Sequence, residues 1–200
     1  MPAPRILVLA ASTRTGSYNR SLAELACRKL EAAGAEVTYP DLRNYRLPVY
    51  DADQEKAEGL PEAARKLHAL FRSHDGIFIA SPEYSANVSP LLVNLLAWVS
   101  RIREDGGMAA AFRQPVFALG SASPGTLGGY RGLIALRNSL ELQLMARVLP
   151  EMVSVAAAHE AFDEQGELRQ PALDEMLTQL VHELVAATTP RRVTMAVAGE

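Results

Sequence analysis

Short apolar runs alternate with helical patterns along the chain, and this alternation constrains the fold more than any other feature of the sequence. Five runs have the length of buried strands: residues 6–11, 36–42, 76–80, 115–119 and 152–157. The first, third and fourth are almost unbroken in apolar character, which is typical of strands covered on both faces of a parallel sheet. The sequence therefore predicts a parallel sheet of five strands.

Helical periodicity fills the segments between and after these runs. The predicted helices are residues 19–33, 60–72, 88–102, 129–149 and 171–187. In the first of them Leu22, Leu25, Ala26 and Leu30 lie on one face, and Gly34 is placed to end the helix. Strands that alternate with helices predict a three-layer α/β fold with right-handed crossovers. We expect one domain over residues 1–190, followed by a C-terminal tail at residues 191–200.

Charge and cysteine content exclude several classes of protein. The formal net charge is −3 without a long basic run, which argues against nucleic acid as a partner. The single cysteine, Cys27, excludes an internal disulfide and a multi-cysteine metal site, and it fits a reducing cytoplasm. No apolar run approaches the length needed to cross a bilayer. We therefore expect a cytoplasmic protein that neither inserts into membranes nor holds a metal ion.

The loop after the first strand has the composition of an anion site. Open parallel sheets bind ligands beyond the carboxyl ends of their strands, so the loops after strands one, three and four belong together. The first loop reads ASTRTGSYN and leads into a helix, whose N-terminus favours anions. Ser17 or Asn19 alone could be an ordinary N-cap, but a cap does not explain the accompanying hydroxyls and arginine. The loop lacks GxGxxG and the lysine of a P-loop, which leaves a monophosphate ester as the predicted ligand.

The loops after the third and fourth strands predict the rest of the site. In SPEYSAN, Pro82 restricts the backbone and Tyr84 offers an aromatic face that suits a flat heteroaromatic ring. For Tyr84 alone, packing on the rim of the sheet is the simpler explanation, and Glu83 alone would be a solvated acid. The fourth strand ends in GSASPGTLGG, where the glycines permit a ligand to approach the backbone closely. A merely flexible loop is the alternative.

Together these three loops resemble the NAD(P)H-dependent FMN reductase family, in the branch of chromate and quinone reductases with a flavodoxin-like fold. The family's first loop, GSxRxxSxN, appears as ASTRTGSYN at residues 11–19. Its PEYN signature appears as PEYS at residues 82–85, and the following WxSR as WVSR at residues 98–101. A Ser/Gly-rich turn at residues 121–129 precedes Leu136-Arg137. The likeness covers about residues 5–187 and implies the strand order 2-1-3-4-5.

The resemblance implies FMN as the cofactor and NADPH or NADH as the electron donor. It assigns Pro82, Glu83, Tyr84 and Ser85 to the isoalloxazine ring and Ser121 to the edge of that ring. Around the phosphate it implies Ser12, Arg14, Gly16, Ser17, Tyr18 and Asn19. Two departures stand out, because Ala11 replaces the family glycine and Ser85 replaces the asparagine of PEYN. Either Asn87 supplies the missing amide or one flavin contact is lost.

The expected reaction is ping-pong hydride transfer from NAD(P)H through flavin N5 to a small-molecule acceptor. Quinones, chromate, azo compounds and free flavin all remain candidate acceptors. No side chain is nominated as a catalytic acid or base, because the cofactor carries the chemistry. The alternatives are a non-catalytic FMN-binding redox sensor and a flavodoxin-type electron carrier. A phosphoester hydrolase is disfavoured, since the loops hold no suitable nucleophile or carboxylate cluster.

The helix predicted at residues 88–102 is apolar around most of its circumference, which is unusual for a helix with one exposed face. This excess of apolar surface predicts a subunit interface that carries Trp98. The family resemblance likewise implies a homodimer or homotetramer. Arg101 and Arg131 are candidates for binding the 2′-phosphate of NADPH.

Overall fold

The computed structural model describes residues 2–188, so the tail predicted at residues 191–200 lies outside the described part of the chain. The strands are β1 (Arg5–Ala10), β2 (Glu36–Thr38), β3 (Gly76–Ala80), β4 (Glu83–Tyr84), β5 (Asn87–Val88), β6 (Val116–Ala122) and β7 (Arg147–Val155). The α-helices are α1 (Tyr18–Ala32), α2 (Ala52–Glu58), α3 (Glu62–Arg72), α4 (Pro90–Arg101), α5 (Tyr130–Asn138), α6 (Ala158–Ala161) and α7 (Pro171–Thr188). Short turns of other helical types lie at Leu42–Asn44, Ala109–Arg113 and Ser139–Gln143.

The main sheet has five parallel strands in the order β2-β1-β3-β6-β7. This confirms the flavodoxin-like order, because the hairpin β4–β5 is a separate small sheet. Within the sheet, Ala10 pairs with Ala80 and Ala80 with Gly120. Strands β1 and β3 therefore end at the same level of the sheet, and β6 continues past that level to Ala122, so the loops that follow the three strands lie at one edge of the sheet.

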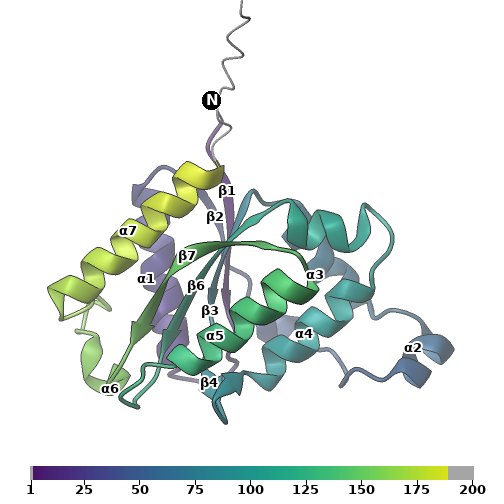
Figure 1. The fold of residues 1–200 in the computed structure, drawn as a ribbon, viewed down its shortest axis with the longest axis horizontal. Coiled ribbons are helices and arrows are strands. Elements are labelled where there is room, and N and C mark those ends of the chain that lie inside the picture. Colours follow the sequence, from purple (N-terminus) through teal and green to yellow (C-terminus); the bar gives the residue numbers. More distant parts are fainter. Residues whose placement is uncertain (1, 189–200) are drawn as a thin grey trace, which may run out of the picture.

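Helices cover both faces of the sheet, as Figure 1 shows. Along β1, Ile6 and Val8 face a core shared with α1 and α7, whereas Leu7 and Leu9 face a core shared with α3, α4 and α5. This alternation follows from the period of two along a strand. Because both faces are covered, all five residues from Ile6 to Ala10 are buried.

Several boundaries differ from those predicted. Strand β2 ends at Thr38 rather than at residue 42, and β6 extends to Ala122 rather than stopping at residue 119. The helix predicted for residues 129–149 is α5 as far as Asn138 and continues as a π-helical turn over Ser139–Gln143, whereas its last predicted residues belong to β7. Leu144 and Leu149 are both buried, so the apolar periodicity that predicted the helix continues into the strand. The predicted start at Val88 is two residues early, because Val88 belongs to β5.

Trp98 does not lie on a surface available to another subunit, which corrects the prediction. Its side chain is fully buried beside Ala64 and Ile102. The indole N–H donates to the carbonyl of Pro48 at 2.8 Å, and the ring of Tyr50 packs edge-on against it at 5.0 Å between centroids. The segment between β2 and α2 thus covers part of the apolar surface of α4. No helix within residues 2–188 combines the length and the hydrophobicity required to span a membrane.

Candidate functional site

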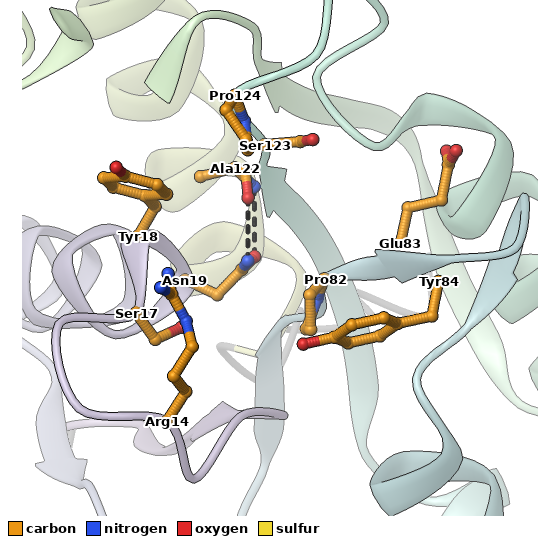
Figure 2. Close-up of a pocket in the computed structure, with 10 residues that line it drawn as sticks. All are labelled: Arg14, Ser17, Tyr18, Asn19, Pro82, Glu83, Tyr84, Ala122, Ser123 and Pro124. Carbon is orange, nitrogen blue, oxygen red and sulfur yellow. Dashed lines mark hydrogen bonds between the residues drawn. The ribbon is translucent and has the colours of Figure 1, made fainter. Parts of the chain in front are cut away.

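The loops after β1, β3 and β6 enclose a pocket of about 400 Å³ at the carboxyl edge of the sheet (Figure 2). Pockets of this size accommodate small organic ligands. Its walls come from all three loops, and they include a positively charged side chain, hydroxyl groups and two tyrosines. The lining residues are Arg14, Ser17, Tyr18, Asn19, Pro82, Glu83, Tyr84, Ala122, Ser123 and Pro124.

The start of α1 leaves hydrogen-bond donors unpaired at this pocket. Ser17 is the N-cap residue, yet its side chain makes no capping hydrogen bond. The N–H groups of Arg20 and Ser21 donate to the carbonyl of Ser17. Helix geometry leaves those of Tyr18 and Asn19 without an intrahelical partner. The first turn carries no acidic residue, so the positive end of the helix dipole is uncompensated. This end of the pocket favours an anion.

Arg14 adds a full positive charge to the same end. Its guanidinium donates to the carbonyl of Gly16 at 3.2 Å and lies 5.5 Å from the centre of the Tyr18 ring. Within residues 2–188 no carboxylate forms an ion pair with it. An exposed guanidinium without a carboxylate partner is well suited to a phosphate.

Asn19 lines the pocket, but its amide already has partners. The side chain donates to the carbonyl of Ala122 at 2.8 Å and accepts from the N–H of Ala122 at 3.0 Å (Figure 2). It therefore joins the start of α1 to the end of β6. Ser12 and Gly16 do not line the pocket. The hydroxyl of Ser12 accepts from the N–H of Arg14 at 3.4 Å, and Gly16 has a φ of +65°, so both shape the loop.

Pro82 and Tyr84 form the opposite side of the pocket. Tyr84 belongs to β4 and is half-exposed, and its ring extends beneath Pro82 toward the side of Arg14 and Ser17 (Figure 2). Strand β4 pairs antiparallel with β5, with Glu83 opposite Val88 and Tyr84 opposite Asn87. The hairpin therefore sets where this wall of the pocket lies.

The turn of the hairpin is strained. Its two central residues, Ser85 and Ala86, have φ values of +51° and +57°. Left-handed backbone costs about 1–2 kcal/mol for a residue with a Cβ, and asparagine and glycine tolerate it best. This gives a physical reason for an asparagine in the family motif at residue 85. Ser85 and Asn87 border a neighbouring groove rather than this pocket, and the Asn87 side chain accepts from the N–H of Val88 at 2.8 Å.

Glu83 is not the solvated loop acid that its position alone predicts. Its side chain is 9% exposed, and its carboxylate points away from the other pocket residues (Figure 2). Arg131 donates to it from Nε at 2.9 Å and also from Nη2. This hydrogen-bonded ion pair holds the pKa of Glu83 below its usual range. Arg131 is therefore already paired, and so is Arg101, which binds Glu55 at 2.9 Å.

The end of β6 and the loop after it contribute pocket residues that were not predicted individually from the sequence. Ala122, Ser123 and Pro124 line the pocket, whereas Ser121 is fully buried and its hydroxyl lacks a hydrogen-bond partner among the described residues. The difference arises because β6 runs on to Ala122 and carries Ser121 into the sheet. The Ser-Pro pair at residues 123–124 repeats the Ser-Pro pair of the other wall at residues 81–82, which is a signal that could have identified it. Residues 2–188 hold no cluster of side chains suited to a metal ion.

Comparison with known proteins yields a consistent set of relatives. A family model described as NADPH-dependent FMN reductase matches residues 4–160. The quinone reductase of Escherichia coli K12 is 32% identical over 179 residues, which cover 88% of this chain and 91% of the relative. A Pseudomonas aeruginosa protein named NAD(P)H-dependent FMN reductase is 28% identical, with 90% and 92% covered. A flavoenzyme NAD(P)H:(acceptor) oxidoreductase of Paracoccus denitrificans has the same fold. It shows a TM-score of 0.74 and 21% identity, over 93% of this chain and 97% of that one.

Proposed function

The chain belongs to the NADPH-dependent FMN reductase family, and we propose that it reduces quinones or similar small acceptors with electrons from NADPH or NADH. In this proposal FMN, held in the pocket of Figure 2, carries the electrons from donor to acceptor. The observation that carries the proposal is the set of donors at Arg14 and the start of α1, which has no carboxylate partner among residues 2–188 and lies opposite the wall formed by Pro82 and Tyr84. A phosphate fits the donors, and a flat ring fits the wall formed by Pro82 and Tyr84. The cytoplasm is the proposed location, because a chain with one cysteine suits a reducing compartment.

The pocket residues divide into two groups in this proposal. Arg14, Ser17 and the N–H groups of Tyr18 and Asn19 would hold the phosphate, with Ser12 and Gly16 shaping the loop around it. Pro82, Tyr84 and the residues 122–124 would hold the isoalloxazine between them. Ser85 and Ser121 would support these walls from outside the pocket.

The chain's own residues bind and orient rather than transfer protons. Bound FMN supplies the redox chemistry, which consists of accepting a hydride and passing electrons on. Glu83 is the only carboxylate among the residues that line the pocket, and Arg131 already binds it. The lining residues therefore include no free carboxylate, and they include no histidine, lysine or cysteine. We infer that donor and acceptor occupy the pocket in turn, which predicts ping-pong kinetics.

An absorbance spectrum of the purified protein under anaerobic conditions tests this function. We expect the spectrum of a bound flavin, its bleaching by NADPH or NADH, and its recovery when a benzoquinone is added. Chromate, an azo dye and free FMN, added in place of the quinone, would rank the acceptors. A protein that neither contains nor takes up FMN would contradict the proposal. A flavin that binds but is not reduced would favour the electron carrier or the redox sensor.

A second copy of the chain is the proposed occupant of an apolar groove beside the pocket. This groove has a volume of about 760 Å³, runs along α4 and shares Tyr84 with the pocket. Its apolar lining includes Val49, which is 84% exposed, and Val93, which is 51% exposed. Exposed apolar surface of this kind marks interfaces. A homodimer or homotetramer that uses this groove would place the flavin site beside the subunit boundary.

The substitution Val93→Glu tests this interface. We expect it to raise the dissociation constant of the oligomer about a hundredfold, because an unpaired carboxylate in an apolar contact costs roughly 3 kcal/mol. Light scattering coupled to gel filtration measures the change in mass. Met176→Glu is the matched control, since Met176 is similarly exposed but lies on α7, across the sheet. An unchanged mass for Val93→Glu would place the interface elsewhere.

A further inference from the structure

Helix α5 lacks a capping side chain of its own. Its N-cap residue is Gly129, with a φ of +88°. The N–H groups of the first turn nevertheless need acceptors. Glu83 supplies one, because its Oε2 accepts from the N–H of Gly132 at 3.1 Å. The carboxylate that caps α5 thus comes from the hairpin that forms one wall of the pocket, 49 residues earlier in the chain.

The backbones of α5 and the hairpin meet at Gly132. A Cβ at Gly132 would lie 3.1 Å from the carbonyl oxygen of Asn87 and 3.2 Å from Cα of Glu83. These two atoms belong to β5 and β4, so the helix contacts both strands of the hairpin. The ion pair of Arg131 with Glu83 lies beside this contact. A capping hydrogen bond, an ion pair and a close backbone contact therefore act together at one point.

The hairpin needs such an anchor, because its turn is strained and its strands are short. Each strand has two residues, and both turn residues, Ser85 and Ala86, have left-handed φ values. Isolated two-stranded hairpins are at best marginally stable even with a favourable turn. Without the contacts of Glu83 with Gly132 and Arg131, we expect the hairpin to leave its present position and to take Tyr84 with it.

We propose that Glu83 is a positioning residue that holds Pro82 and Tyr84 against the ring of FMN by capping α5 beside Arg131 and Gly132. It acts through the hairpin and not by touching the cofactor. This inference rests on the proposed flavin pocket and deepens it. It also reassigns Glu83 from a ring contact to the support of that contact.

The test compares four variants: Glu83→Ala, Glu83→Gln, Ala86→Gly and the double variant Glu83→Ala/Ala86→Gly. Fluorescence quenching of FMN and of riboflavin gives both affinities. We expect Glu83→Ala to lower the affinity for both ligands about tenfold, which corresponds to about 1.4 kcal/mol, because FMN and riboflavin both carry the isoalloxazine ring. Glu83→Gln keeps a side-chain oxygen that can accept from the N–H of Gly132, so this variant should lose less affinity. Ala86→Gly relieves the turn and should restore most of the affinity in the double variant.

Amide hydrogen exchange on the protein freed of flavin provides the second readout. Glu83→Ala should increase the exchange rate across residues 83–88 and the first turn of α5 while leaving the first turn of α1 unchanged. Unchanged exchange there, or a double variant that binds FMN as weakly as Glu83→Ala, would overturn the proposal. Failure of the parent protein to bind FMN would contradict the proposed function instead, and the exchange data would still decide whether the anchor exists.

Discussion

We expect the substitution Arg14→Ala to weaken FMN binding by about tenfold to a hundredfold and to leave riboflavin binding almost unchanged. The guanidinium has no carboxylate partner among residues 2–188, and it lies at the pocket beside the uncapped start of α1. A hydrogen bond to a charged group contributes about 1.5–3 kcal/mol, and each 1.4 kcal/mol is a factor of ten in affinity. Riboflavin lacks the phosphate, so it does not use this contact.

Titration of the apoprotein with each flavin, followed by fluorescence quenching, measures both affinities. Arg113→Ala is the matched control, because Arg113 is also exposed but lies just before β6, at the opposite edge of the sheet. It makes the same change in net charge far from the pocket. Raising the salt concentration should weaken FMN binding to the parent protein more than to Arg14→Ala. If Arg14→Ala lowers the affinity for FMN and for riboflavin equally, Arg14 holds the loop and not the phosphate.

Asn19→Ala should lower the free energy of unfolding by about 3 kcal/mol, even in the absence of flavin. The Asn19 side chain is buried and satisfies both the N–H and the C=O of Ala122, which is itself buried. Alanine leaves both groups without a partner, and each such group costs about 1–3 kcal/mol. The start of α1 would also lose its connection to the end of β6.

Urea denaturation of the apoprotein measures this loss. Asn94→Ala is the control, because Asn94 also makes two side-chain hydrogen bonds, to Tyr50 and Pro48, but is only partly buried. We expect it to cost about 1 kcal/mol, since water can replace partners at an accessible site. A stable Asn19→Ala variant that has lost FMN affinity would show that the amide serves the ligand rather than the fold.

The central strands of the sheet were readable from the sequence because burial on both faces leaves an almost unbroken apolar run. The predicted third strand coincides with β3, where every residue is buried. Helix α2 left no such signal, since none of its residues is buried and its sequence shows no apolar face. The hairpin β4–β5 was equally unreadable, because two-residue strands are too short for any periodicity. Its contacts with α5, through Glu83 and Asn87, are not revealed by any local pattern.

The sequence predicts which loops form the candidate site, whereas the partners of the polar side chains in those loops depend on the fold. The carboxyl ends of parallel strands must meet at one edge, so the three loops could be grouped without coordinates. The partner of a carboxylate or an amide, by contrast, depends on which backbone the fold brings near it. Asn19 reaches a strand 103 residues away and Glu83 a helix 49 residues away, and both are thereby committed to the framework of the pocket. Within residues 2–188, the guanidinium of Arg14 forms no ion pair and donates only to the carbonyl of Gly16, and the Ser17 side chain makes no capping hydrogen bond, so both remain available to a ligand.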